Sequence, residues 1–141
     1  MKNINLFLCL LFITLVFSGC SNKVSMRGKV TFSDDQSPLT TGAVTFQSGD
    51  YVAKGILKPD GTYVLGSTST KDGLPPGEYQ VFVNGAVKVE EQRVGGTAMG
   101  GVSVGITIPL IDAKYADPST SGLVVKVDRR TKRFDFTVER P

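Results

Sequence analysis

The chain has 141 residues, of which 40% are hydrophobic, and it contains no His, no Trp and two Cys. This length suits one small domain, and a chain without His has no Ser/His/Asp or Cys/His relay and no His-bearing zinc or iron site. The formal charge of +3 comes from 16 basic and 13 acidic residues. This balance lacks the large positive field that nucleic-acid binding requires, so nucleic acid is not expected as a partner.

The N-terminus has the layout of a secretory signal. Lys2 supplies a positive charge, and residues 6–17 are apolar except for Thr14. A membrane-spanning helix needs about 20 apolar residues, so this run predicts a signal sequence and not a membrane span. The run ends in Phe17-Ser18-Gly19-Cys20.

Small residues directly before a cysteine resemble the bacterial lipobox, in which lipid is attached to the cysteine thiol and the chain is cut just before it. The resemblance implies a lipoprotein signal peptide over residues 1–19, cleavage between Gly19 and Cys20, lipidation of Cys20 and a tether over residues 20–23. Phe17 departs from the aliphatic residue usual at its position. The alternative is a conventional secretory signal that contains a cysteine. If the lipobox is processed, Cys9 leaves with the signal and no free thiol remains.

Residues 24–141 predict one all-β domain. Short runs of alternating apolar and polar residues are separated by Gly, Pro and Asp clusters, without a helix-length amphipathic stretch. Eight short strands at this density are typical of a sandwich or a barrel. The strands are expected at residues 24–32, 43–47, 51–57, 62–66, 78–84, 103–108, 123–128 and 133–138.

Alternation within the strands predicts the core, because residues two apart on a strand share a face. Tyr79, Val81 and Val83 are expected to face inward, and so are Leu123, Val125 and Val127 in one later strand and Phe134, Phe136 and Val138 in the last. Phe82 lies on the other face of its strand. It is expected to cover the outer side of the sheet or to lie beneath a loop.

The segment Lys58-Pro59-Asp60-Gly61 has the composition of a tight turn and predicts a hairpin between residues 51–57 and 62–66. Asp60 and Asp72 are possible calcium ligands by residue type. Each stands in an isolated Asp-Gly pair without spaced acidic partners, so turn roles are favoured. No metal and no cofactor is predicted.

Two other segments are candidates for function. Residues 86–105 are interpreted as a mobile hairpin extension, with a partner-binding loop as the alternative. A dense basic run covers residues 129–133 and is expected to form a solvated turn, with contact to anionic lipid or polysaccharide as the alternative. The candidate binding-surface residues are Phe82, Arg93, Met99 and Tyr115.

A set of short motifs follows in order along the mature chain: Gly28-Lys29-Val30-Thr31-Phe32, Pro38-Leu39, Gly42-Ala43-Val44-Thr45-Phe46, Asp60-Gly61-Thr62-Tyr63 and Pro76-Gly77-Glu78-Tyr79-Gln80-Val81. In this order they resemble the carboxypeptidase-regulatory-like, transthyretin-like domain. Together with the lipobox, Ile108-Pro109 and the block Lys114-Tyr115-Ala116-Asp117-Pro118-Ser119-Thr120-Ser121-Gly122-Leu123 are similar to small bacterial lipoproteins of that class.

The resemblance implies a seven- to eight-stranded Greek-key β-sandwich, prealbumin-like and Ig-like, with a non-enzymatic role. Tyr63 and Tyr79 are then expected to enter the core while their hydroxyl groups reach the backbone. The segment Leu110-Ile111-Asp112 is an insertion relative to this pattern. The class includes hydroxyisourate hydrolases that use His and a C-terminal Tyr-Arg-Gly-Ser, but this chain has no His and ends in Glu139-Arg140-Pro141.

The predicted function is a lipid-anchored, extracytoplasmic module of the cell envelope, structural or binding an envelope protein or carbohydrate. Its membrane partner is reached through lipid on Cys20, in the cell membrane or the outer membrane, and Ser21 favours the outer membrane. One alternative is a carbohydrate-binding module that uses Phe82, Tyr51 and Tyr115 as aromatic platforms. A hydrolase that works without His is the other alternative.

Overall fold

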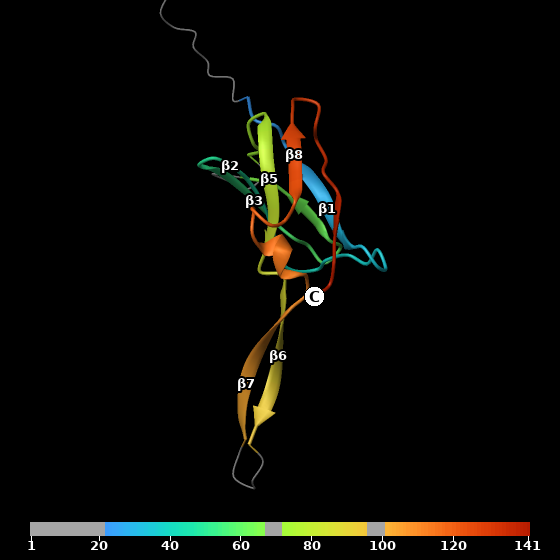
Figure 1. The fold of residues 1–141 in the computed structure, drawn as a ribbon, viewed down its shortest axis with the longest axis vertical. Coiled ribbons are helices and arrows are strands. Elements are labelled where there is room, and N and C mark those ends of the chain that lie inside the picture. Colours follow the sequence, from blue (N-terminus) through green and yellow to red (C-terminus); the bar gives the residue numbers. More distant parts are fainter. Residues whose placement is uncertain (1–21, 67–71, 96–100) are drawn as a thin grey trace, which may run out of the picture.

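The computed structural model describes residues 22–66, 72–95 and 101–141. Within these ranges the chain forms β-strands and one short 3₁₀ helix, which confirms the all-β prediction. Figure 1 shows a body from which one long two-stranded arm projects. The elements are β1 (Arg27–Phe32), β2 (Ala43–Ser48), β3 (Tyr51–Ile56), β4 (Thr62–Val64), β5 (Gly77–Asn84), β6 (Val87–Val94), β7 (Val102–Pro109), η1 (Ala113–Ala116), β8 (Leu123–Val127) and β9 (Phe136–Val138).

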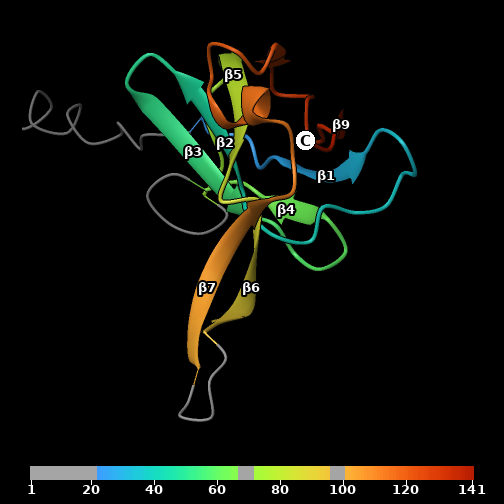
Figure 2. The same cartoon turned by 60° about the horizontal axis from the view of Figure 1, so that its bottom comes forward.

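The body is a sandwich of two sheets (Figure 2). One sheet has the order β4-β1-β9, in which β1 pairs antiparallel with β4 and parallel with β9. The other has the order β3-β2-β5-β8 and is antiparallel throughout. The chain passes from one sheet to the other after β1, β3, β4 and β8, as in a Greek-key sandwich. The arm is a separate pair, β6-β7.

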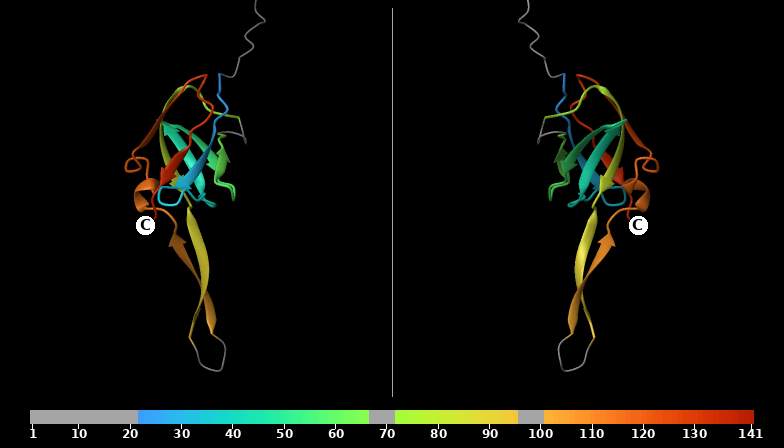
Figure 3. Two further views of the ribbon diagram at one scale, coloured as in Figure 1. Left: turned by 90° about the vertical axis from the view of Figure 1, so that its right-hand side faces the viewer. Right: turned by 90° about the vertical axis from the view of Figure 1, so that its left-hand side faces the viewer.

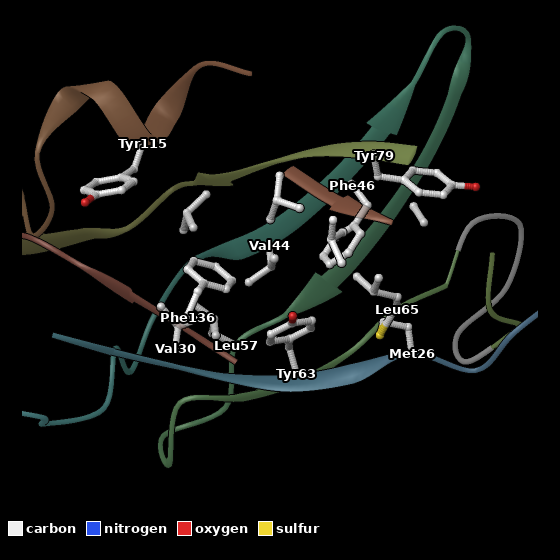
Figure 4. Close-up of a cluster of buried hydrophobic side chains, with 14 of the residues drawn as sticks. Met26, Val30, Val44, Phe46, Leu57, Tyr63, Leu65, Tyr79, Tyr115 and Phe136 are labelled. Atoms are coloured by element: carbon white, nitrogen blue, oxygen red, sulfur yellow. The ribbon is translucent and has the colours of Figure 1, made fainter. Parts of the chain in front are cut away.

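The core lies between the two sheets. Figure 4 shows side chains of both sheets pointing toward one another, with Tyr63 of β4 facing Phe46 and Val44 of β2. The Phe46 and Tyr63 ring centroids are 6.3 Å apart. Complete burial of an apolar side chain of this size contributes about 1.5–3 kcal/mol to the free energy of folding. The inward residues predicted for β5, β8 and β9 are buried or half-buried, as alternation requires.

The predicted hairpin between residues 51–57 and 62–66 is wrong in its pairing. The tight turn itself is present, since Gly61 N–H donates to the Lys58 carbonyl oxygen at 2.8 Å. However, β3 pairs with β2 and β4 pairs with β1, so the turn joins two different sheets. The two segments are linked by an isolated antiparallel bridge between Lys54 and Gly66, and Lys58 N–H donates to the Thr62 carbonyl oxygen at 2.9 Å. The reason is that Leu57 is buried in the core and the chain turns a corner there.

The arm begins two residues after β5 and adds a strand that the sequence prediction lacked. β6 pairs with β7 over its whole length, from Val87 opposite Pro109 to Val94 opposite Val102. The prediction of a hairpin extension over residues 86–105 is therefore confirmed for its described part, whereas residues 96–100 lie outside the described residues. The side chains of both strands are exposed except at Val87, which is half-buried.

Candidate functional site

The predicted processing site, Gly19 and Cys20, lies outside the described residues. The described chain starts at Asn22, and Val24 is already fixed to the body. Val24 N–H donates to the Leu74 carbonyl oxygen at 2.7 Å, and Leu74 N–H donates back at 3.0 Å. The body therefore begins directly after the segment predicted to be the tether.

A basic depression surrounds this start of the chain. Lys23, Arg27, Arg129 and Lys132 line an open hollow of about 570 Å³ together with Asn22, Val24 and Ser25. The parallel alignment of β1 with the last segment of the chain produces this cluster, because Arg27 N–H donates to the Lys132 carbonyl oxygen at 3.2 Å. Residues about 100 positions apart in sequence thus place their cationic side chains at one end of the body.

Charge in this depression is partly compensated. The Lys23 ammonium group lies 2.9 Å from an Asp72 carboxylate oxygen, and this hydrogen bond raises the pKa of Lys23 above its ordinary value. Among the described residues, no ion pair is found for Arg27, Arg129 or Lys132. The hollow is therefore a net cationic surface that can take an anionic group, and its openness to solvent makes each single contact weak.

The basic run at residues 129–133 forms the predicted solvated turn. The Asp128 carboxylate accepts hydrogen bonds from Arg130 N–H at 2.7 Å and Thr131 N–H at 2.8 Å. These backbone hydrogen bonds hold the pKa of Asp128 below its ordinary value. Arg129 and Lys132 point from this turn into the depression, whereas Arg133 pairs with Asp135 at 2.6 Å.

Sequence reasoning grouped Arg129 and Lys132 but missed Lys23 and Arg27 as their neighbours. The signal that could have found Lys23 is its position directly after the predicted tether. Arg27 could not be assigned in this way, because its place depends on the pairing of the first strand with the end of the chain.

The three described candidate binding-surface residues, Phe82, Arg93 and Tyr115, do not form one exposed surface. Arg93 is exposed near the end of β6, and Met99 lies outside the described residues. Phe82 and Tyr115 are only 8% and 7% exposed. An aromatic platform needs an exposed ring face, so the prediction that Phe82 and Tyr115 belong to a binding surface is wrong for this structure.

Tyr115 is buried because η1 folds back onto β5. The Asp112 carboxylate accepts a hydrogen bond from Lys114 N–H at 2.9 Å and thereby caps the short helix. The Lys114 side chain then reaches Glu139 at 2.6 Å, which ties η1 to the C-terminal segment. Figure 4 shows the Tyr115 ring below this helical turn. The inserted residue Ile111 is also buried, so the insertion adds to the core.

Phe82 lies on the outer face of its sheet, opposite the core residues Val81 and Val83. It is opposite Thr45 in the register of β5 and β2, and Thr45 is only 1% exposed. Phe82 therefore lies on the outer side of the sheet. Its burial shows that this face is itself covered, which a strand pattern alone does not reveal.

The isolated Asp-Gly pairs have turn and pairing roles. The Asp60 carboxylate accepts hydrogen bonds from Thr62 N–H at 3.0 Å and from Thr62 Oγ1 at 2.6 Å. Asp72 pairs with Lys23. Across residues 22–66, 72–95 and 101–141, no group of three or more His, Cys, Asp or Glu side chains could hold a metal ion.

The arm is the second distinctive surface. One of its faces carries an apolar row along β7, in which Val102 is 68% exposed and Ile108 is 39% exposed. Val104 and Ile106 lie between them in the same row and are exposed as well. Arg93 belongs to the other face, opposite Ser103. Exposed apolar rows of this kind mark sites of protein association.

Comparisons with known proteins add little to this description. No family model matches the sequence, and no curated protein matches it. Among solved structures, a 9R-lipoxygenase from Cyanothece PCC8801 matches with a TM-score of 0.34 and 16% sequence identity. The match covers 82% of this chain and 16% of the lipoxygenase chain. A likeness this weak carries no argument about function.

Proposed function

We propose that the chain is a lipid-anchored, extracytoplasmic lipoprotein whose β-sandwich is a non-enzymatic structural or interaction module of the cell envelope. The main support is the layout of the molecule. The start of the described chain and the β6-β7 arm lie at opposite ends of the long axis (Figure 3). A lipid on Cys20 holds the first end at a membrane and directs the arm away from it.

The basic depression supports this orientation. Only Ser21 separates Cys20 from Asn22, and an extended chain covers about 3.5 Å per residue, so the depression lies within about 10 Å of the lipid-bearing residue. Each Lys or Arg at an anionic bilayer surface contributes about 1 kcal/mol of attraction. Lys23, Arg27, Arg129 and Lys132 are placed to provide this attraction. The acyl chains provide the attachment itself, and several chains hold far better than one.

The arm supports an interaction role, since both of its faces are exposed and no other element of the described chain pairs with it. A protein partner is favoured over carbohydrate because Phe82 and Tyr115 are buried and Tyr51 is half-buried. The resemblance to transthyretin-like lipoproteins points to the same non-enzymatic role. No helix among the described residues is long and apolar enough to cross a membrane, and a lipid anchor needs none.

The proposal is tested by expressing the full chain with a Cys20→Ala substitution and with a matched Cys9→Ala substitution. We expect the unchanged chain and Cys9→Ala to incorporate a labelled fatty acid and to sediment with membranes. Cys20→Ala should lose the label and, once exported and cleaved, appear in the soluble fraction. A mature protein that carries an unmodified Cys20 thiol would refute the lipid anchor.

A further inference from the structure

Up to Pro109, which ends it, the open edge of β7 lacks the features that normally protect an edge strand. Residues 102–108 read Val-Ser-Val-Gly-Ile-Thr-Ile, which are uncharged, rich in β-branched side chains and without Pro. β6, the other edge of the arm, carries Lys88, Glu90, Glu91 and Arg93. Charged side chains on an edge strand oppose pairing with another chain, and a long uncharged edge favours it. The two edges therefore differ, and β7 is the edge open to a partner strand.

Main-chain groups at three positions of β7 face this open edge. Leu110 N–H donates to the Ala86 carbonyl oxygen at 2.9 Å, so residue 110 points its backbone groups toward β6. Hydrogen-bonding direction alternates along an antiparallel strand. The N–H and C=O groups of Ser103, Gly105 and Thr107 consequently point away from β6. Among the described strands, none pairs with β7 on that side.

The sequence of β7 is symmetric about Gly105. Ser103 lies two residues before Gly105, and Thr107 lies two residues after it. The other positions hold the β-branched residues Val102, Val104, Ile106 and Ile108. If two β7 strands pair antiparallel with a two-fold axis at Gly105, each residue lies opposite a residue of the same chemical class. Valine meets isoleucine, serine meets threonine, and glycine meets glycine. In a two-fold interface residue i meets residue j and residue j meets residue i, so this pattern places apolar against apolar and hydroxyl against hydroxyl side chains at every pair.

From these observations we propose that the partner of β7 is β7 of a second copy of this chain, paired antiparallel about Gly105. The pairing joins two arms into a four-stranded sheet. An isolated two-stranded hairpin is marginally stable in water, whereas three or more strands with an apolar face are stable. The apolar rows of both arms lie side by side on one face of that sheet. The proposal names the partner of the interaction module proposed above. Because antiparallel pairing places the two bodies at opposite ends of the joined sheet, two lipid-anchored copies would approach each other from facing membrane surfaces. The test of the pairing does not depend on the lipid.

A disulfide placed at the two-fold axis tests the register. Gly105 accepts a side chain, because an added Cβ would meet no atom closer than Val89 Cγ1 at 3.6 Å. In the full chain we expect Gly105→Cys to give a reducible dimer under mild oxidation. Glu91→Cys is the matched control, since Glu91 is exposed and directly opposite Gly105 but belongs to β6. The unchanged chain sets the background from Cys9 and Cys20. Equal dimer yields in all three proteins would overturn the proposed register.

A second pair of variants tests association without an added thiol. Thr107→Pro removes an N–H group that points to the open edge, so the ladder to β6 keeps its hydrogen bonds. Val89→Pro makes the same change at the same level of the arm on the outer edge of β6. Sedimentation of the full chain should show a dimer that Thr107→Pro weakens by about tenfold or more and Val89→Pro leaves intact.

A full chain that stays monomeric at high concentration while its β-sheet circular dichroism is intact would overturn the proposal and leave β7 open to a strand of another protein. Loss of the dimer in both proline variants would also count against it, because the effect would then not be specific to the β7 edge. If Thr107→Pro disrupts the hairpin itself, the Gly105→Cys result still decides the question. The fatty-acid labelling experiment on Cys20 is independent of all these outcomes.

Discussion

The hydroxyl group of Tyr63 donates a hydrogen bond of 2.6 Å to the carbonyl oxygen of Phe134, 71 positions further along the chain. Tyr63 is fully buried, and burial raises the pKa of its hydroxyl group above the ordinary value. The bond links β4 to the segment that leads into β9 within the same sheet, across β1. The family resemblance implied that the hydroxyl groups of Tyr63 and Tyr79 reach the backbone, and both do, since Tyr79 donates to Pro75 at 2.7 Å.

Replacing Tyr63 with Phe is expected to lower the free energy of unfolding by about 1–2 kcal/mol, because the Phe134 carbonyl group loses a partner in a buried place. Urea titration of the full chain measures the change. Tyr51→Phe is the control, since its hydroxyl group is half-buried and its bond to Gly73 is longer, at 3.2 Å. An equal loss in both variants would contradict a special role for the Tyr63 bond.

Gly28 is expected to tolerate no side chain. A Cβ atom there would lie 1.8 Å from the Phe134 carbonyl oxygen and 2.7 Å from the Tyr63 hydroxyl oxygen. Gly28→Ala must therefore displace backbone, and a loss of about 3 kcal/mol is expected. At Gly77 the nearest atom to an added Cβ is 3.5 Å away, so Gly77→Ala should change stability by less than about 0.5 kcal/mol. Thermal denaturation compares the two, and similar melting temperatures would refute the prediction.

Asp35 makes the domain sensitive to acid. Hydrogen bonds from Ser37 Oγ at 2.6 Å and Ser37 N–H at 2.9 Å, with Arg140 nearby, lower the pKa of Asp35 from 3.8 to about 2. Because the folded pKa lies below the unfolded one, the ionised group stabilises the fold above about pH 4, and this contribution is lost as the pH falls toward 2.

Ser37→Ala removes the strongest of these hydrogen bonds and should raise the pKa of Asp35 toward its ordinary value. The stability advantage above pH 4 then becomes smaller, and the stability curve between pH 2 and pH 5 becomes flatter. Ser48→Ala, at an exposed position on the opposite sheet, is the control. Denaturation at a series of pH values tests this, and parallel curves for Ser37→Ala and the unchanged chain would show that the bond has no effect.

Neutralising the basic run is expected to leave membrane fractionation unchanged. The variant replaces Arg129, Arg130, Lys132 and Arg133 with Gln, and the acyl chains proposed on Cys20 would still hold the protein. Only the orientation of the body on an anionic surface should loosen. Sedimentation of membranes from cells that express the variant measures attachment. Appearance of the variant in the soluble fraction would mean that these charges, and not lipid, hold the protein.

We expect Tyr115 to stabilise the fold through packing and not to bind a glycan. Tyr115→Ala removes a ring that is 7% exposed and should cost about 3 kcal/mol of stability, as for other buried aromatic residues. Val124→Ala, at a position that is 55% exposed, should cost little. Urea titration distinguishes the two. An unchanged midpoint for Tyr115→Ala, together with loss of binding to a glycan, would restore the aromatic platform that the structure argues against.

Local pattern predicted the inward face of the strands at residues 78–84, 123–128 and 133–138, because one face of a sandwich strand is buried and its apolar residues alternate with polar ones. The pairing of the strands was harder to predict than their inward faces. The turn at Lys58-Pro59-Asp60-Gly61 was predicted correctly, but whether the next strand pairs with the previous one depends on contacts far away in sequence. β6 was missed for a different reason. Both of its faces meet solvent, so Glu90-Glu91-Gln92-Arg93 shows no apolar alternation.

The candidate site was predicted less completely than the fold. The basic turn was expected from composition, yet its grouping with Lys23 and Arg27 results from the parallel pairing of β1 with β9. Phe82 and Tyr115 were candidates because they are aromatic residues that the strand pattern does not assign to the core. Their burial comes from tertiary packing, in which η1 lies against β5. The alternation of apolar and polar residues along one strand does not indicate which segment covers the outer face of that strand.

Because β6 follows β5 almost directly, a force applied to the arm is transmitted to the body through β5. Only Gly85 and Ala86 separate the arm from β5, an inner strand of the larger sheet. Tension between an arm-bound partner and an N-terminal anchor enters the body through β5 at one end and through Val24 and β1 at the other. β1 is also an inner strand, held by neighbours on both edges. Under the proposed function, both attachment points lead to inner strands that can be pulled out only by breaking two ladders of hydrogen bonds together.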